Sequence, residues 1–108
     1  MNMPHTDMRW TFTPESLYYG PKAFYERYKL PIYITENGVA VTEWLSADKT
    51  LCDPSRVEYI RSFVKQLGRA REDGADIRGH FPWSLMDTLV CIDVSSIRFG
   101  RVRVHFRR

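Results

Sequence analysis

The chain has 108 residues, of which 44% are hydrophobic and 14% aromatic, which excludes a disordered polymer and allows one small domain with a modest core. The formal net charge of +3 arises at the C-terminal end, where five arginines follow position 97 and no acidic residue follows Asp93. Without these five arginines the acidic residues outnumber the basic ones. A basic segment can bind the phosphates of nucleic acids or can form the charged face of an edge strand. Nucleic-acid binding is the weaker of these two interpretations, and we do not expect a nucleic acid as the partner.

The cysteine, histidine and hydropathy patterns suggest neither a metal site nor a membrane segment. Cys52 and Cys91 lie far apart and no CxxC pair is present, so a zinc site is not expected. The three histidines do not take a metal-ligand spacing such as HExxH. No apolar run reaches the length of a transmembrane helix, and the N-terminus lacks the apolar core of a signal peptide. We expect a soluble cytoplasmic protein with two free thiols and no cofactor.

The first predicted element is a helix that begins at Thr13-Pro14-Glu15. Thr is a favourable N-cap, while Pro and Glu suit the first turn. Gly20-Pro21 is expected to kink or break this helix, because proline removes a backbone hydrogen bond and its ring clashes with the preceding turn. The helix then resumes over residues 22–29. Phe24 and Tyr28, four residues apart, are expected to face the core.

A short apolar strand follows over residues 32–35, where β-branched and aromatic side chains favour a pleated surface. It ends in Glu36-Asn37-Gly38, and the glycine marks a turn. In parallel α/β folds the catalytic groups are mounted at the carboxyl ends of strands. Glu36 is therefore either a catalytic carboxylate or a solvated residue of a strand-to-loop turn, and the local pattern leaves both interpretations open.

Residues 39–52 show no sustained period and predict a long loop, in which Trp44 is a candidate aromatic at the rim of a site. The strongest helix comes next, with Asp53 as N-cap, Pro54 at the first helical position and Gly74 after its end. An apolar stripe at helical spacing is expected to face the core, and a charged face is expected to face water. The stripe comprises Val57, Ile60, Phe63, Val64, Leu67 and Ala70, and the charged face comprises Arg56, Glu58, Arg61, Lys65 and Arg71.

Two more strands are predicted, over residues 77–85 and within residues 98–108. Gly79 and Pro82 make the first of them irregular. The order helix, strand, loop, helix, strand, loop, strand contains a strand–helix–strand crossover, which implies a parallel pair. The fold class is therefore α/β, with few parallel strands and covering helices. Because two or three strands with exposed edges are not stable alone, we expect a homo-oligomer that restores the missing neighbours.

Several segments match, in order, one known pattern. Residues 32–38 (IYITENG) resemble a nucleophile motif, and further matches lie throughout the chain: Asp7-Met8-Arg9-Trp10, Pro14-Glu15, Asp53-Pro54-Ser55-Arg56-Val57, Tyr59-Ile60, Asp73-Gly74-Ala75-Asp76-Ile77-Arg78-Gly79, Phe81, Trp83-Ser84-Leu85-Met86-Asp87 and Arg98-Phe99-Gly100. Together they resemble the C-terminal quarter of the family 1 glycoside hydrolases, the β-glucosidases. The resemblance implies that residues 1–108 are a single segment of a (β/α)8 TIM barrel.

The resemblance also implies hydrolysis of small β-glucosides with retention, by two glutamates about 5 Å apart. It makes Glu36 the nucleophile and Trp83 the tryptophan that floors the sugar site. Asn37 and Trp44 are the further candidate substrate-binding residues.

The chain departs from the family pattern in two places. No Asn-Glu-Pro tripeptide, in which the family carries its acid/base glutamate, is present, so a substitute would come from Glu43, Asp87 or a neighbouring subunit. After Asp87 the family has Asn-Phe-Glu-Trp, whereas this chain has Thr88-Leu89-Val90-Cys91, and Val90 cannot accept a hydrogen bond from a sugar hydroxyl. Two functions stay open: a β-glucosidase-type hydrolase, and a non-catalytic carbohydrate-binding or self-assembly module derived from one.

Overall fold

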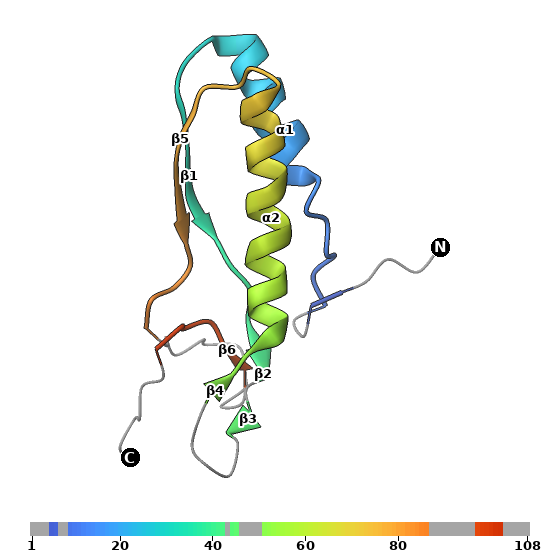
Figure 1. Cartoon of the computed structure of the whole chain (residues 1–108), viewed down its shortest axis with the longest axis vertical. Helices are drawn as coiled ribbons and strands as arrows, with labels where there is room; N and C mark the ends of the chain where they lie inside the picture. Colours follow the sequence, from blue (N-terminus) through green and yellow to red (C-terminus); the bar gives the residue numbers. More distant parts are fainter. Residues whose placement is uncertain (1–4, 7–8, 43, 46–50, 87–96, 103–108) are drawn as a thin grey trace.

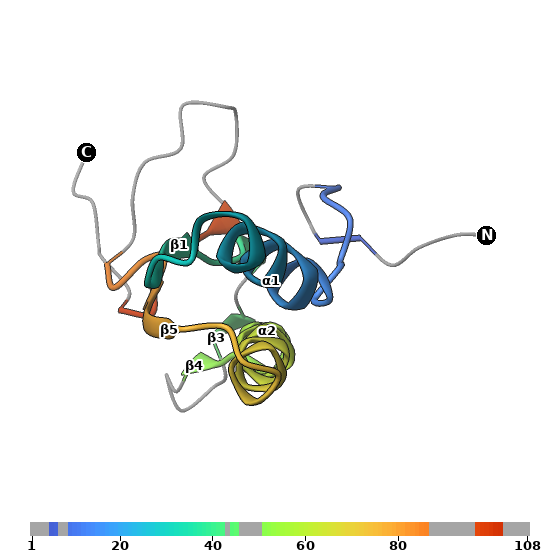
Figure 2. The same ribbon diagram turned by 90° about the horizontal axis from the view of Figure 1, so that it is seen from above.

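The computed structural model describes residues 5–6, 9–42, 44–45, 51–86 and 97–102. Its body consists of two helices, α1 (Ser16–Tyr28) and α2 (Pro54–Glu72), and two longer strands, β1 (Ile32–Asn37) and β5 (Ile77–Pro82) (Figure 1). Four strands of two residues each lie beyond the carboxyl ends of β1 and β5: β2 (Val41–Thr42), β3 (Trp44–Leu45), β4 (Leu51–Cys52) and β6 (Ile97–Arg98). Both helices lie on the same side of the β1–β5 pair, and among the described residues no helix covers the other side (Figure 2).

β1 and β5 pair in parallel, as the predicted crossover through α2 requires. Ile32 lies opposite Ile77, and Asn37 lies opposite Pro82, with irregular register between them. Two hydrogen bonds close the pair at its ends: Ile32 N–H donates to Asp76 O at 2.8 Å, and Trp83 N–H donates to Asn37 O at 2.8 Å. The predicted α/β fold with a parallel pair is confirmed.

The predicted loop over residues 39–52 is wrong in part, because it contains β2, β3 and β4. β2 pairs antiparallel with β6, and β3 pairs antiparallel with β4. Val39, Ala40 and Val41 are among the most buried residues of the described chain. The partner of β2 lies more than fifty residues away in the sequence, and a local hydrophobic period cannot reveal a non-local pairing of this kind.

The predicted start and break of the first helix are both wrong. Glu15, not Thr13, is the N-cap of α1, and it makes no side-chain cap hydrogen bond. α1 then runs without a break through Pro21, which is buried. Packing of α1 against α2 explains this continuity, since it offsets the one backbone hydrogen bond that a proline removes.

Phe24 and Tyr28 do not face the core. Their side chains are 62% and 55% exposed, and the two rings stack on each other with centroids 6.4 Å apart. The spacing of four does place them on one face of α1, as predicted, but that face is not the one that packs on α2.

α2 begins and ends as predicted. The Asp53 carboxylate accepts a hydrogen bond from Arg56 N–H at 3.0 Å, Pro54 occupies the first turn, and Gly74 follows the helix with a φ of +99°. Its core face is narrower than the predicted stripe, because Val57 and Val64 are 54% and 43% exposed. The buried apolar residues of α2 are Phe63, Leu67 and Ala70.

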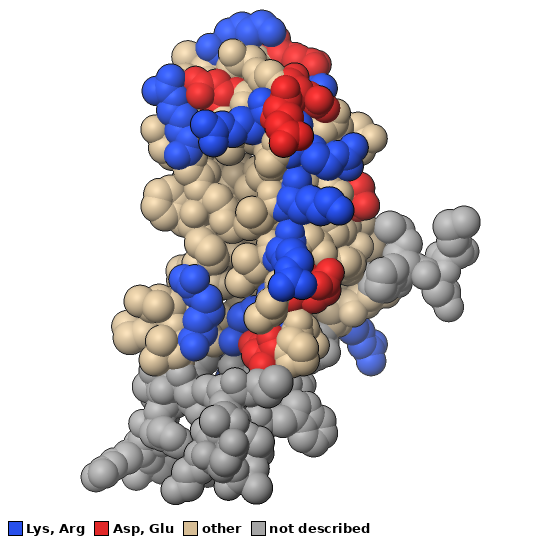
Figure 3. Space-filling view, in the orientation of Figure 1, with Lys and Arg blue, Asp and Glu red and all other residues tan. Residues whose placement is uncertain are grey.

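Arg56, which was expected to face water, is buried with 6% of its surface exposed. The other charged residues of that predicted face are exposed, and a column of basic side chains runs along α2 in Figure 3. No helix among the described residues is both long and apolar enough to cross a membrane.

Several predictions fall on residues outside the described part of the chain. They concern Glu43, Asp87, the family departures at residues 88–91, and the basic end at residues 103–108. Of the strand predicted within residues 98–108, the described part contains the last residue of β6 and a parallel bridge between Met86 and Val102. The strand predicted over residues 77–85 ends at Pro82.

Candidate active site at the ends of β1 and β5

The carboxyl ends of β1 and β5 bring Glu36-Asn37-Gly38 against Trp83. Trp83 N–H donates to Asn37 O at 2.8 Å, directly after the last residue of β5. A Cβ atom on Gly38 would lie 1.9 Å from the Trp83 carbonyl oxygen, so only glycine fits at position 38. Two segments that the sequence places 45 residues apart therefore form one lip of the sheet.

Glu36 is exposed at this lip. Along β1, Ile32, Ile34 and Asn37 are half-buried, whereas Tyr33, Thr35 and Glu36 are exposed. The exposed Glu36 carboxylate is accessible to a small molecule at the lip. This accessibility is what a nucleophile at a strand end requires.

Asn37 makes a side-chain contact across the strand pair. Its Oδ1 lies 3.1 Å from Nε2 of His80 on β5, and because an amide oxygen can only accept, Nε2 is the donor. Burial lowers the pKa of His80, which favours the neutral ring. Burial raises the pKa of the Tyr59 hydroxyl on α2.

Trp83 is 43% exposed at the end of β5, and its peptide bond to Ser84 is cis. Ser84 itself is buried, and its hydroxyl donates to Met86 O at 2.7 Å. Its backbone bonds to the segment after β6: Arg101 N–H donates to Ser84 O at 3.1 Å. Trp83, the predicted sugar-site tryptophan, thus lies on a loop whose backbone is hydrogen-bonded both to the end of β1 and to the segment after β6.

Arg56 links the start of α2 to the Arg98-Phe99-Gly100 segment by hydrogen bonds. Its guanidinium donates to Gly100 O at 2.6 Å and to Arg98 O at 2.9 Å, and it forms an ion pair with Asp53 at 2.7 Å. Sequence reasoning missed this role, because the charge pattern of the helix placed Arg56 on the water-facing side. The two segments that Arg56 joins, residues 53–57 and residues 98–100, were both matched to the family, but nothing in their sequence shows that they touch.

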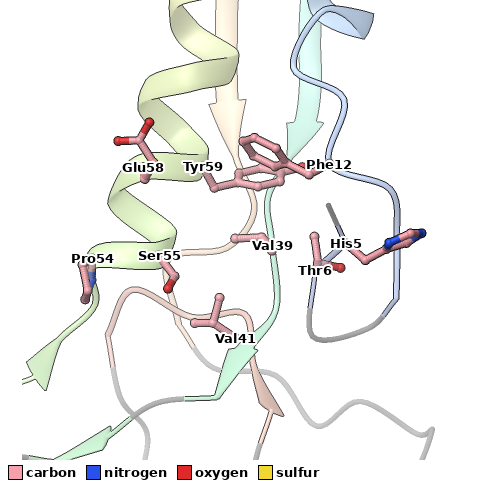
Figure 4. Close-up of a pocket in the computed structure, with 9 residues that line it drawn as sticks. All are labelled: His5, Thr6, Phe12, Val39, Val41, Pro54, Ser55, Glu58 and Tyr59. Carbon is pink, nitrogen blue, oxygen red and sulfur yellow. The ribbon is translucent and has the colours of Figure 1, made fainter. Parts of the chain in front are cut away.

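A cavity of about 440 Å3 lies on the helix side of the lip, between the N-terminal segment and the first turns of α2 (Figure 4). Phe12 and Tyr59 lie side by side at one end of it, while the Glu58 carboxylate and the His5 ring point away from its centre. The full lining is His5, Thr6, Phe12, Val39, Val41, Pro54, Ser55, Glu58 and Tyr59. Neither Glu36 nor Trp83 lines it, so this cavity is separate from the lip. No motif or periodicity in the sequence predicted this cavity.

Trp44 lies on β3, opposite Cys52 of β4. Its role in substrate binding stays a prediction, as do the roles of Glu43 and Asp87 as acid/base, which lie outside the described residues.

Comparison with known proteins identifies the family. All 108 residues match the family model described as Glycosyl hydrolase family 1. The chain belongs to this family. A family 1 relative, the 1,4-beta-D-glucan glucohydrolase of Thermotoga neapolitana, is 38% identical over 106 residues, which are 97% of this chain and 25% of the relative. The beta-galactosidase of Saccharolobus solfataricus is 38% identical over 104 residues, which are 96% of this chain and 19% of the relative.

The same relationship holds between structures. The family 1 β-glucosidase of Thermotoga maritima, solved in complex with isofagomine lactam, superposes with a TM-score of 0.90 at 35% identity, over 97% of this chain and 24% of that one. This family 1 chain spans about a quarter of the length of the relatives that it matches. Its α/β fold is part of a TIM barrel, as the sequence resemblance implied.

Proposed function

We propose that this chain carries the nucleophile of a retaining β-glucosidase-type hydrolase, with Glu36 as nucleophile and Trp83 as the floor of the sugar site. The observation that carries this proposal is the exposed Glu36 at the carboxyl end of a parallel strand, next to Asn37, whose carbonyl bonds Trp83, in a chain of glycosyl hydrolase family 1. The relatives named above are glycosidases by name, and we propose a small β-glucoside as the substrate.

The chemistry proceeds in two displacements. A Glu36 oxygen attacks the anomeric carbon, so that an ester bond to the sugar forms as the glycosidic bond breaks. The leaving oxygen needs a proton from an acid, and water then cleaves the ester with retention of configuration. The candidates for the acid are Glu43, Asp87 and a carboxylate of a second copy of the chain.

We also propose that the chain self-associates. Among the described residues, β1 and β5 pair only with each other, so each has one unpaired edge. Parallel sheets are normally covered on both faces, and a second copy would supply sheet neighbours together with a further candidate carboxylate for the acid.

Trapping of the glycosyl-enzyme tests the nucleophile. A dinitrophenyl 2-deoxy-2-fluoro-β-glucoside has a leaving group that needs no acid, and the fluorine slows hydrolysis of the covalent intermediate. We expect mass spectrometry to find one fluoroglucosyl adduct, on the peptide that contains Glu36. The Glu36→Gln variant should carry no adduct, and Glu15→Gln, which alters an exposed glutamate at the start of α1, should be labelled like the wild type. An adduct on another residue, or equal labelling of Glu36→Gln, removes Glu36 from the mechanism.

The second candidate is a non-catalytic carbohydrate-binding module. It is favoured by Val90, which stands where the family has a glutamate that grips the sugar. This function is supported if calorimetry shows that the chain binds cellobiose while the fluoroglucoside leaves no covalent adduct. Loss of that binding in Trp83→Ala would then assign the binding surface.

A further inference from the structure

The two strands of the parallel pair each have one edge without a neighbouring strand. Among the described residues β1 pairs only with β5, so each strand has a free edge whose backbone N–H and C=O groups can pair with a further strand. The two free edges differ, because one belongs to β1 and the other to β5. A second copy that adds in parallel can therefore join its β1 to the free edge of β5 of the first copy, which is a head-to-tail contact.

A head-to-tail contact leaves a free edge at each end, so further copies add until the strands either close into a ring or continue as a filament. The geometry of the β1–β5 pair decides between these outcomes. The chain superposes on about a quarter of the family 1 β-glucosidase of Thermotoga maritima with a TM-score of 0.90. A TIM barrel closes with eight parallel strands, and each copy supplies two of that geometry. Equivalent steps of this size close after four copies.

The two faces of the pair also match the two sides of a barrel wall. Both helices lie on one side of β1 and β5, as the outer layer of a TIM barrel requires (Figure 2). The rings of Tyr33 and Phe81 lie on the same face of the pair, since a Cβ on Gly79 would be 2.6 Å from the first ring and 3.1 Å from the second. Both residues are more than half exposed. Side chains of this kind fill the interior of a closed barrel.

We propose that four copies of this chain join head to tail, with β5 of each copy parallel to β1 of the next, and form a closed eight-stranded barrel with the helices outside. Parallel pairing places the carboxyl ends of all the strands at one rim, so the four Glu36 residues lie at the same end of the barrel. A carboxylate of a neighbouring copy, which is one candidate for the acid, can then reach this rim. That consequence rests on the proposed function, whereas the closed ring does not.

The mass of the associated 108-residue chain tests the number of copies. Size-exclusion chromatography with light scattering should find four chains as the largest well-defined species, with dissociation on dilution. A species of two or three chains at the highest concentrations, a broad distribution of longer polymers, or a monomer throughout would each overturn the closed ring of four.

Linked copies distinguish a ring of four from a pair without any change inside the chain. Copies joined by long Gly/Ser linkers bind one another at high effective concentration wherever the linker can span the contact. Two linked copies should associate as two molecules, and four linked copies should remain single molecules. Three linked copies are the matched control, because they leave a gap of one copy and should associate further. Two linked copies that remain single molecules would show that the unit is a pair and would overturn the proposal.

Distances between spin labels test the four-fold symmetry. Lys65 is exposed on α2, so Lys65→Cys together with Cys52→Ser and Cys91→Ser gives one label in each copy. Four labels at the corners of a square give two distances with a ratio of about 1.4, whereas a two-fold dimer gives a single distance. A single distance in the labelled chain would overturn the ring. The linked copies keep the proposal testable if the cysteine variant does not fold.

Labelling by the fluoroglucoside is independent of the mass, so the two proposals can fail separately. A mass of four chains without an adduct on Glu36 would refute the proposed function and support the ring. An adduct on Glu36 in a chain that is a monomer or a dimer would support the nucleophile and overturn the ring.

Discussion

Gly38 lies where the two strand ends approach too closely for any side chain. A Cβ atom there would lie 1.9 Å from the carbonyl oxygen of Trp83 and 2.8 Å from its carbonyl carbon. Both atoms belong to the backbone, which cannot rotate away as a side chain can. Gly38 is thus required by the approach of β1 to the Trp83 loop, and its φ lies outside the left-handed region.

Gly38→Ala should therefore lower the free energy of unfolding by about 2–3 kcal/mol, the cost of forcing extra volume into a packed site. Urea denaturation followed by circular dichroism measures it. The matched control is Gly20→Ala: nothing lies within 4 Å of a Cβ at this position in α1, so the replacement should stabilise the helix by about 0.5–1 kcal/mol. Equal effects of the two replacements would contradict the close approach.

Arg56 links two elements that are distant in the sequence, the first turn of α2 and the segment that follows β6. Its buried guanidinium donates hydrogen bonds to two backbone carbonyls and forms an ion pair with the Asp53 carboxylate. The planar fork of arginine suits several acceptors, whereas the ammonium of lysine is a point charge. The contact therefore depends on the shape of the guanidinium as well as on its charge.

Arg56→Ala should destabilise the chain by about 3 kcal/mol, because it leaves buried carbonyls and the partly buried Asp53 carboxylate without their partner. Arg56→Lys should recover only part of this loss. Arg61→Ala on the same helix is the control: its ion pair with Glu58 spans 3.7 Å between side chains that are 72% and 63% exposed, so we expect a change of about 0.5 kcal/mol or less. Thermal or urea unfolding measures the free energy of unfolding of the three variants. If Arg56→Ala lowers it no more than Arg61→Ala does, Arg56 does not link the two elements.

The elements that the sequence predicted well are those specified by local signals. The cap at Asp53-Pro54, the stop at Gly74 and the apolar run of β1 each depend on neighbours within a few residues. β2 could not be predicted in this way, because its pairing with β6 depends on distant residues. The continuity of α1 through Pro21 likewise depends on packing against α2, which overrides local propensity.

The same distinction holds at the candidate site. Glu36 and Trp83 could be nominated from motifs, because a motif records the residue type and its order in the chain. The bonds from Arg56 to Arg98 and Gly100, and the hydrogen bond between Asn37 and His80, each join different elements. No periodicity or spacing within one element carries that information.

At the scale of the whole molecule, the uncovered face of β1 and β5 is the most exposed apolar part of the sheet. Tyr33 and Phe81 are 53% and 56% exposed, and the Tyr33 ring lies over Gly79, where a Cβ would be only 2.6 Å from it. In Figure 3 the charged side chains gather at the end of the molecule where α1 meets β1 and along α2. A half-covered parallel pair with an apolar open face is expected to bind a further layer.

The 108-residue chain should therefore self-associate through this face. Size-exclusion chromatography with light scattering should give a mass of at least two chains, with dissociation on dilution. Phe81→Lys places a charge on the open face and should shift the equilibrium toward the monomer. Phe24→Lys is the matched control, because Phe24 is 62% exposed on α1, away from that face, and its replacement should leave the mass unchanged. A well-folded wild-type monomer at every concentration tested, or equal dissociation in the two variants, would show that the open face does not bind a second copy.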